Sequence, residues 1–317
     1  MVVMSLADAL PNVTRNRALA EGEAGRLWLA TLDEKVARVA QAWSLTPGAV
    51  LTGGTGALVL GAQTEDGTDV VLKLGMPGDE DILEEARVLE AAKGQGYAGL
   101  LAHSYDERTL LLECLGEQLT DSDYSVDQQI TILCQTLVQA WRVPTVGLAL
   151  MTGAEKAHSL ANFITENWSQ WSANTALEVR DRALAFAHHR AAAFDPDQSV
   201  LVHGDAHGFN TLYWKDSSEG LPLYKFVDPD GIFSEPAYDL GIAMREWSQD
   251  LLEGDVVERG RSRLGLLHRL TGVDEKAIFQ WGFLERVSTG LLCRSLKEEV
   301  WAQEMLGVAE AWLRLDP

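Results

Sequence analysis

Residues 199–228 form a short β-rich island in a part of the chain that is otherwise predicted to be helical. "SVLVH" predicts a strand that ends at His203, "NTLYW" predicts a second strand that starts at Asn210, and "YKFVD" predicts a third that ends at Asp228. Asp205, Asn210 and Asp228 therefore stand at strand ends or in the loop between strands. Residues placed in this way can converge on one cleft, and we expect these three to do so.

Asp205, Asn210 and Asp228 are the residue types that phosphoryl transfer requires. One carboxylate can accept the proton of a hydroxyl nucleophile, whereas an amide oxygen and a second carboxylate are hard ligands suited to Mg²⁺. Mg²⁺ held by one or two protein oxygens completes its shell with water and substrate phosphates. A polar hairpin with Asx turns is the alternative, but His203-Gly204-Asp205 followed five residues later by Asn210 is a rare combination.

The rest of the chain divides into two lobes. Short glycine-broken strands are predicted within residues 50–75 and 99–119, and helices are predicted at 25–43, 79–96, 126–142, 155–171, 175–194, 237–252, 255–271 and 274–313, the last dividing near Glu298. At 317 residues the chain exceeds the usual size of a single core. We expect an α+β fold: a small antiparallel nucleotide-binding lobe with an N-terminal helix over 1–115, and a larger helical lobe with the catalytic loop and acceptor site over 116–317.

Lys73 stands in the middle of the apolar strand "VVLKLG", where a cation is costly unless it faces an anion. Glu84 and Glu85 on the following helix are candidate partners, and Glu85 is our choice. A Lys–Glu pair that links strand to helix would hold the ammonium group against the α- and β-phosphates of a nucleotide. A solvent-facing lysine on an edge strand is the alternative.

Two other segments are candidates for nucleotide contacts. In "TGGTGA", Gly53, Gly54 and Thr55 would let backbone amides approach phosphate closely. "LLLECLG" would connect the lobes, with the backbone around Glu113 and Leu115 facing adenine, although an ordinary buried strand fits this segment as well. The chain has no G-x-x-x-x-G-K-[ST] motif and no G-x-G-x-x-G motif that opens a helix, which argues against a P-loop or dinucleotide fold.

Charge and cysteine content narrow the classes of partner. The formal net charge is −21, from 47 acidic and 26 basic residues, so the surface repels nucleic-acid phosphates and attracts cationic small molecules. The three cysteines are far apart and form no CxxC pair, which indicates a reducing compartment without a zinc or disulfide framework. We see no secretory signal and no apolar run long enough to span a membrane. We expect a cytoplasmic monomer or dimer with no nucleic-acid or membrane partner.

These motifs, in this order, resemble those of the aminoglycoside phosphotransferases, in particular the branch of streptomycin 6-phosphotransferases and hydroxyurea phosphotransferases. The resemblance covers nearly the whole chain and includes "LTGGTGALVLGA", "TLLLECLGEQL", "VHGDAHGFNTL" and "VDPDGIFSEPAYDLG". It implies a protein-kinase-like bilobal fold that uses Mg²⁺ and ATP or GTP. Asp205 would be the catalytic base, Asn210 and Asp228 the magnesium ligands, and Lys73 with Glu85 the grip on the nucleotide phosphates.

The resemblance also implies supporting roles around the catalytic loop. His203 would brace the loop, His207 would support it, and Asp239 at a helix start would accept hydrogen bonds from loop amides. Asp239 follows Asp228 by only 11 residues, which leaves no room for a peptide-binding activation segment. The acceptor is therefore expected to be a small molecule.

The helical lobe is expected to bind this acceptor through acids and an aromatic side chain, which suit a guanidinium or ammonium group. The candidates are Asp121, Asp123, Glu246, Trp247 and Asp250. The expected function is transfer of the γ-phosphate of ATP to a hydroxyl of a cationic acceptor such as a streptomycin-like aminoglycoside, with antibiotic resistance as the outcome. Three alternatives stay open: a kinase of a macrolide, choline-like amine or homoserine-like metabolite; a nucleotide-binding scaffold with little catalysis; and a metal-dependent hydrolase built on His203, Asp205 and His207.

Overall fold

The structure is a computed structural model that describes residues 5–51, 56–78, 81–215 and 220–317. The chain separates into two compact units, Met1–Gly116 and Glu117–Pro317, which we call unit 1 and unit 2 and describe one at a time. In the described part of the chain, no helix has both the length and the apolar character needed to cross a membrane.

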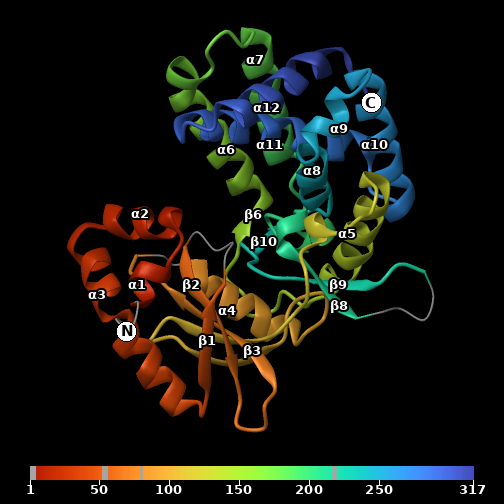
Figure 1. The fold of residues 1–317 in the computed structure, drawn as a ribbon. Helices are drawn as coiled ribbons and strands as arrows, with labels where there is room; N and C mark the ends of the chain where they lie inside the picture. Colours follow the sequence, from red (N-terminus) through yellow and green to blue (C-terminus); the bar gives the residue numbers. More distant parts are fainter. Residues whose placement is uncertain (1–4, 52–55, 79–80, 216–219) are drawn as a thin grey trace. The chain divides into compact units, whose positions relative to one another are not determined.

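Unit 1 is built on an antiparallel sheet whose strands run in the order β1-β2-β3-β5-β4 (Figure 1). The strands are β1 Thr46–Val50, β2 Ala57–Gln63, β3 Asp69–Gly75, β4 Leu100–Ser104 and β5 Thr109–Glu113. In the central strand β3, Lys73 pairs with Val59 of β2 and with Leu110 of β5. Because side chains alternate along a strand, Lys73 points to the opposite face from its neighbours Leu72 and Leu74.

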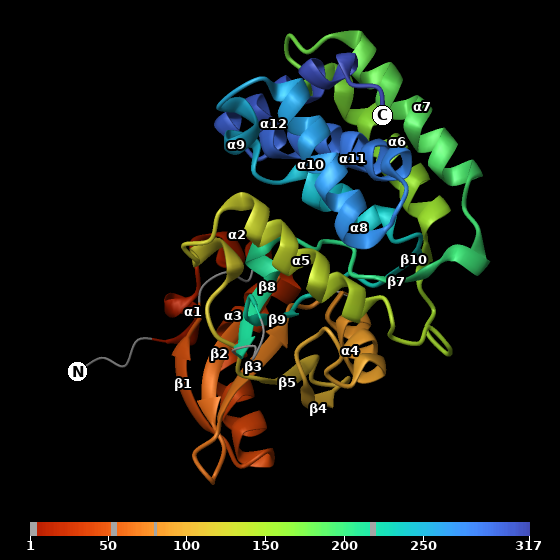
Figure 2. The same cartoon turned by 90° about the vertical axis from the view of Figure 1, so that its right-hand side faces the viewer.

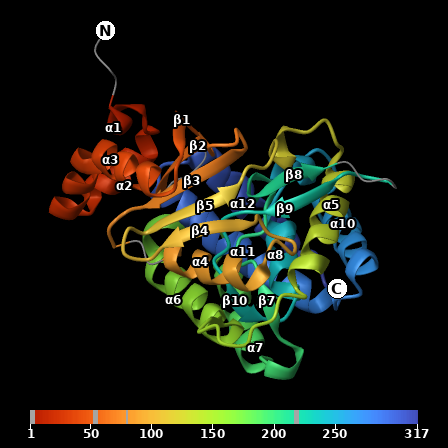
Figure 3. The ribbon, with the colours of Figure 1, turned by 90° about the horizontal axis from the view of Figure 1, so that it is seen from below.

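Helices cover the two faces of this sheet (Figure 3). The helices of unit 1 are α1 Leu6–Ala9, α2 Asn12–Ala20, α3 Gly22–Ala42 and α4 Asp81–Ala92. In α3, apolar residues recur every three or four positions, and these side chains form one core with residues of β2 and β3: Trp28, Leu32, Val36 and Val39 with Leu58, Leu60, Leu72 and Leu74. The face that carries Lys73 is therefore the one turned to α4.

Unit 2 is mainly helical. Its helices are α5 Val126–Ala140, α6 Gly153–Trp171, α7 Leu177–Ala192, α8 Ala237–Arg245, α9 Ser248–Leu252, α10 Val256–Thr271, α11 Glu275–Ser295 and α12 Glu299–Ala311, with the 3₁₀ turns η1 Leu119–Asp121, η2 Pro196–Gln198, η3 Gly208–Asn210 and η4 Trp312–Arg314. The long helix α11 is buried along almost its whole length and packs against α6, α7, α8 and α12. It is the centre of the unit 2 core, and it fixes α8.

The segment of unit 2 that contains Asp205, Asn210 and Asp228 is carried by short strands (Figure 2). β6 Met151–Thr152, β10 Ile232–Ser234 and β7 Val200–Val202 form one small sheet in the order β6-β10-β7. β8 Thr211–Lys215 and β9 Leu223–Phe226 form an antiparallel hairpin that packs on α5. β7 ends one residue before His203, and β9 ends two residues before Asp228. The two small sheets thus bring both ends of the predicted site to one place.

The expected single helix over 237–252 is wrong. α8 ends at Arg245, Trp247 adopts a left-handed conformation with φ 49°, and α9 starts at Ser248. The carbonyl groups released at this break are taken by buried arginines: Arg286 donates to the carbonyl oxygens of Met244 and Arg245, and Arg263 donates to those of Glu246 and Trp247. Tertiary hydrogen bonds therefore replace the helical ones. The elements α1, α2, β6 and β10 were also not predicted, and β1 starts before the expected strand region.

Candidate active site

The loop after β7 is held by the carboxylate of Asp239 at the start of α8. This carboxylate is fully buried and accepts hydrogen bonds from the backbone N–H groups of His203 at 2.9 Å and Gly204 at 3.0 Å, and from the indole N–H of Trp141 at 2.9 Å. Burial raises the pKa of Asp239 to about 6, against the effect of these three donors. Gly204 has φ +95°, and a Cβ at this position would lie 2.6 Å from the Cβ of Asp230, so the turn requires glycine.

His203 ties this loop to the end of β9. The N–H of Asp205 donates to Nδ1 of His203 at 3.1 Å, and Nε2 lies 3.0 Å from the carbonyl oxygen of Val227. These two contacts require the neutral tautomer with the proton on Nε2, and burial lowers the pKa of His203 to about 4. Both ring nitrogens are used inside the protein, so His203 holds Asp205 near Asp228 instead of presenting a metal ligand.

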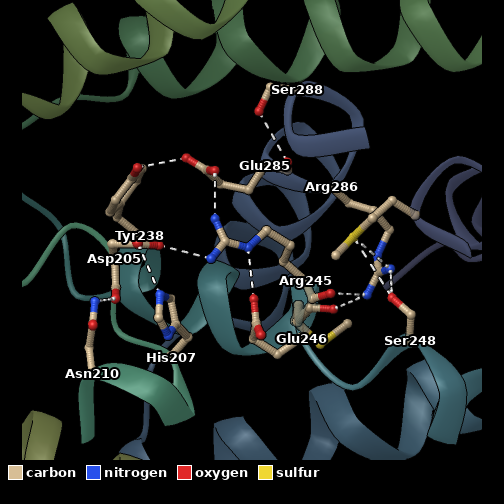
Figure 4. A network of polar contacts seen from close by, with 12 residues as sticks. Asp205, His207, Asn210, Tyr238, Arg245, Glu246, Ser248, Glu285, Arg286 and Ser288 are labelled. Carbon is tan, nitrogen blue, oxygen red and sulfur yellow. Dashed lines mark hydrogen bonds and ion pairs between the residues drawn. The ribbon is translucent and has the colours of Figure 1, made fainter. Parts of the chain in front are cut away.

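The carboxylate of Asp205 is held at both oxygens (Figure 4). Arg245 donates from Nη2 to Oδ1 at 2.8 Å, and Nε2 of His207 lies 3.1 Å from Oδ2. Burial by itself raises the pKa of Asp205, but the Arg245 guanidinium and His207 outweigh it and hold that pKa well below its usual range. For His207, burial lowers the pKa, but the bond to Asp205 outweighs it and raises the pKa above its usual value. Asp205 is thus an oriented anion whose side chain keeps 38% of its surface exposed.

Asn210 and Asp228 lie beside this loop. Asn210 donates from Nδ2 to the backbone carbonyl oxygen of Asp205 at 3.1 Å, and the backbone carbonyl of Asn210 accepts from the N–H of Val227 at 3.0 Å. The amide nitrogen is therefore turned to the loop and the amide oxygen is the free end of the side chain. Asp228 follows Val227 in a left-handed conformation with φ 60°. The loop thus brings one amide oxygen and one carboxylate to the end of β9.

No group of three or more His, Cys, Asp and Glu residues in the described ranges could hold a metal ion. A metal on Asn210 and Asp228 would need further ligands from substrate and water, which is how Mg²⁺ binds. The hydrolase alternative would need His203 as a metal ligand, but both of its ring nitrogens are engaged within the protein, and His207 contacts Asp205 through Nε2.

Arg245 is a site residue that the sequence did not reveal. Besides Asp205, it contacts Glu246 from Nε at 3.0 Å and Glu285 from Nη1 at 3.6 Å, and Tyr238 donates its hydroxyl to Glu285 at 2.6 Å (Figure 4). An arginine near the end of a helix looks like a surface residue, and two of its partners, Asp205 and Glu285, stand 40 residues before and after it. The sequence signal that could have pointed to this role is that Arg245 lies on the same helix as Asp239.

The candidate acceptor residues lie in two segments of unit 2. Asp121 and Asp123 are exposed in and just after η1, which packs against η3. Glu246, Trp247 and Asp250 lie at the break between α8 and α9. Their polar groups are engaged: Glu246 pairs with Arg245, the Trp247 indole N–H donates to Gln129 at 3.0 Å, and Asp250 pairs with Arg259 and Arg263 at 3.0 and 2.9 Å.

The nucleotide candidates belong to unit 1. Lys73 and Glu85 form a buried ion pair at 2.6 Å between β3 and α4, whereas Glu84 is exposed. Glu113 accepts a hydrogen bond from the N–H of Gly99 at 2.9 Å, and Leu115 follows β5 in an irregular segment. Gly53, Gly54 and Thr55 lie outside the described residues.

Sequence comparison assigns the chain to a family. Residues 42–295 match the sequence model of the family described as aminoglycoside/hydroxyurea antibiotic resistance kinases. A streptomycin 6-kinase of Streptomyces griseus is 28% identical over 307 residues, which cover 92% of each chain. A streptomycin 6-kinase of Streptomyces glaucescens is also 28% identical, over 89% of this chain and 90% of the relative. A hydroxyurea phosphotransferase of Kitasatospora aureofaciens is 30% identical over 78% of this chain and 74% of the relative.

Solved structures show the same fold. The amicoumacin kinase hAmiN matches with a TM-score of 0.63 at 13% identity over 90% of this chain and 98% of its own. The choline kinase LicA from Streptococcus pneumoniae matches with a TM-score of 0.60 at 14% identity over 88% and 97%, and the aminoglycoside phosphotransferase APH(3'')-Id from Streptomyces rimosus with 0.56 at 16% over 82% and 98%. The predicted α+β, protein-kinase-like fold is confirmed. The chain belongs to the family of aminoglycoside/hydroxyurea antibiotic resistance kinases.

Proposed function

We propose that this kinase transfers the γ-phosphate of ATP, with Mg²⁺, to a hydroxyl group of a small cationic acceptor of the streptomycin-like aminoglycoside type. The observation that carries the proposal is the arrangement around Asp205, a partly exposed carboxylate fixed at both oxygens with Asn210 bonded to its backbone. The relatives named as streptomycin 6-kinases support the acceptor class. The Streptomyces rimosus phosphotransferase has been solved with ADP and streptomycin, and hAmiN with AMP-PNP and Ca²⁺, which supports nucleotide and divalent metal use.

In this proposal Asp205 orients the acceptor hydroxyl. Each carboxylate oxygen has two lone pairs, so the contacts with Arg245 and His207 leave one on each oxygen for a hydroxyl donor. The phosphoryl group passes through a loose transition state, so the attacking oxygen needs little basic assistance before the bond to the leaving group is largely broken. A weakly basic but well-oriented carboxylate suits this reaction, because most of the acceleration comes from positioning and charge neutralisation.

The metal and the nucleotide phosphates have their own candidate residues. The amide oxygen of Asn210 and the carboxylate of Asp228 would hold Mg²⁺, which when bound neutralises charge on the β- and γ-phosphates. Lys73, fixed by Glu85, would contact the α- and β-phosphates. Further nucleotide contacts in the proposal come from Gly53, Gly54, Thr55, Glu113 and Leu115.

The residues proposed to bind the cationic acceptor are mainly carboxylates. Asp121 and Asp123 are exposed carboxylates on the segment that packs against η3. At the α8–α9 break, Glu246 keeps 22% of its side chain exposed and is the candidate for direct contact with a cation, while Trp247 and Asp250 would shape the wall behind it.

The test is an acceptor panel with purified protein and Mg²⁺-ATP, in which mass spectrometry detects the phosphorylated product. Streptomycin is expected to be phosphorylated; choline, homoserine and a macrolide serve as the other classes. Hydroxyurea is included because one relative with that activity is 30% identical. Turnover of hydroxyurea or a neutral acceptor without turnover of any aminoglycoside would refute the cationic class.

The base assignment is tested by Asp205→Asn. The variant keeps the size of the side chain but loses the anion, so we expect turnover to fall by roughly 1,000-fold. Binding of the nucleotide, measured by calorimetry, should persist. Turnover close to that of the wild type would contradict the role of Asp205.

A further inference from the structure

A single guanidinium group at the end of α8 contacts three carboxylates. Arg245 reaches Asp205 from Nη2 at 2.8 Å, Glu246 from Nε at 3.0 Å and Glu285 from Nη1 at 3.6 Å. Each nitrogen of the guanidinium group therefore has a different partner (Figure 4). Arg245 itself is only 9% exposed, so these contacts are made where water does not replace them easily.

The surroundings of Arg245 fix it in place. Glu285 is buried on α11 and accepts the hydroxyl of the fully buried Tyr238 at 2.6 Å, which leaves its other carboxylate oxygen to face Arg245. Arg286, also on α11, donates to the backbone carbonyl of Arg245 at 2.6 Å. Both the backbone and the side chain of Arg245 are thus held from α11, a buried helix in the core of unit 2.

The contact with Asp205 is not needed to neutralise the arginine. Glu285 and Glu246 already supply two carboxylates for one guanidinium group. The shortest contact nevertheless goes to Asp205, whose side chain is the most exposed of the three, at 38% against 22% and 6%. The shortest contact of Arg245 therefore fixes Asp205, the carboxylate of the three that a substrate can reach most easily.

We propose that Arg245 is a positioning residue of the phosphotransfer reaction. It fixes Oδ1 of Asp205 while His207 fixes Oδ2, so the carboxylate presents its remaining lone pairs to the acceptor hydroxyl in one direction. The inference rests on the proposed function, and it names a residue outside the catalytic loop on which the geometry of the base depends. Tyr238 and Glu285 are the supports of this positioning residue.

A lysine cannot take over this role. The three nitrogens of the guanidinium group are rigidly spaced and satisfy three carboxylates at once, whereas an ammonium group is a single donor centre on a flexible stem. Arg245→Lys keeps the charge and most of the volume but loses the simultaneous contacts. It therefore separates the effect of geometry from the effect of charge.

The test compares Arg245→Ala and Arg245→Lys with the wild type in steady-state kinetics. We expect kcat to fall by roughly 100-fold in the alanine variant, the loss that a misplacement of about 1 Å causes, while the KM for ATP stays unchanged. The lysine variant should remain well below the wild type. Methylguanidinium, at concentrations far below those that unfold the protein, should restore part of the kcat of Arg245→Ala, and methylammonium at equal ionic strength should not.

The matched control is Arg190→Ala. Arg190 is equally buried and pairs with a carboxylate, Glu235, at 3.1 Å, but has no contact with Asp205. It should lose stability without a guanidinium-dependent change in kcat. If Arg245→Ala does not fold, Tyr238→Phe and Glu285→Gln weaken the same support more mildly, and each should lower kcat without changing the KM for ATP.

The outcomes are distinguishable. A folded Arg245→Ala or Glu285→Gln with wild-type kcat overturns the inference and leaves the proposed function intact. Rescue of Arg190→Ala by methylguanidinium to the same extent also overturns it, because the effect would then be structural. A wild-type protein that phosphorylates no acceptor of the panel contradicts both the proposed function and the inference.

Discussion

The crossing of α8 and α11 depends on two glycines, and Gly241→Ala is the sharpest test of how this crossing supports the site. A Cβ on Gly241 would lie 2.6 Å from the Cβ of Trp281 and 2.9 Å from the backbone nitrogen of Gly282. A Cβ on Gly282 would in turn lie 2.5 Å from the Cβ of Met244. Backbone atoms cannot rotate away as a flexible side chain does, so the added methyl group forces the helices apart.

The size of the effect follows from two opposing contributions. Overpacking in a close-packed core costs about 1–3 kcal/mol, and we take the upper end because the added Cβ meets backbone atoms. Alanine in place of glycine within a helix returns about 1 kcal/mol, so we expect a net loss of about 2 kcal/mol in the free energy of unfolding. Activity should fall as well, because α8 carries Asp239 at its start and Arg245 at its end. A shift of α8 away from α11 would lengthen the bond from Arg286 to the Arg245 carbonyl.

Urea denaturation of wild type and variant measures the change, with Gly307→Ala as the control. Gly307 is exposed within α12, and a Cβ there would meet nothing within 4 Å, so this substitution should stabilise the protein by about 0.5–1 kcal/mol. If Gly241→Ala proves as stable as the wild type, the close approach of the two helices is not a constraint and the reasoning is refuted. If Gly307→Ala also destabilises, the effect is not specific to the crossing.

Three further predictions concern the loop after β7 and the proposed metal site beside it. Gly204→Ala should abolish turnover, because φ +95° and the 2.6 Å approach to the Cβ of Asp230 leave no room for a methyl group; wild-type kcat would contradict this. Between pH 6.5 and 4, His203 becomes protonated in the unfolded chain but stays neutral in the native state. The wild type should therefore lose about 3 kcal/mol in the free energy of unfolding over this range, and the His203→Gln variant should not, as measured by urea denaturation at several pH values. Asp239 titrates in both proteins, so its contribution cancels in the comparison. Removal of divalent cations with EDTA should abolish turnover, and Mg²⁺ should restore it. The thermal midpoint should stay unchanged, because Asn210 and Asp228, the proposed ligands, give Mg²⁺ only two protein oxygens and the other ligands come from substrate and water. A large drop in the midpoint would contradict this expectation.

The sequence predicted the elements whose signal is local. The apolar spacing in 25–43 became α3 over Gly22–Ala42, and the expected division near Glu298 separates α11 from α12. Lys73 in an apolar strand indicated its ion pair with Glu85, because an unpaired cation cannot be buried there. In these cases the apolar spacing or the charge of neighbouring residues in the sequence is enough to predict the structure.

The features that the sequence did not reveal depend on distant residues. Nothing near Trp247 signals a break, since there is no glycine or proline at that position; the break exists because Arg263 and Arg286 bind the released carbonyls. β6 and β10 are two and three residues long, too short for an alternating pattern, and they form only by pairing with each other and with β7. The role of Arg245 was hidden because its carboxylate partners come from three separate segments.

The charges around Asp205 bear on the acceptor as well as on the base. Arg245 alone would repel a cationic substrate from Asp205, the proposed base. It faces three carboxylates, however, so these four groups together keep an excess of two negative charges, which falls to one when His207 is protonated. Glu285 is almost fully covered, whereas Glu246 and Asp205 are partly exposed, so the excess charge is presented on the side of these two residues. In the proposed reaction a cationic acceptor would therefore be drawn to Glu246 and would bring its hydroxyl to Asp205, while Arg245 would keep the Asp205 carboxylate from turning toward the positive charge of the substrate.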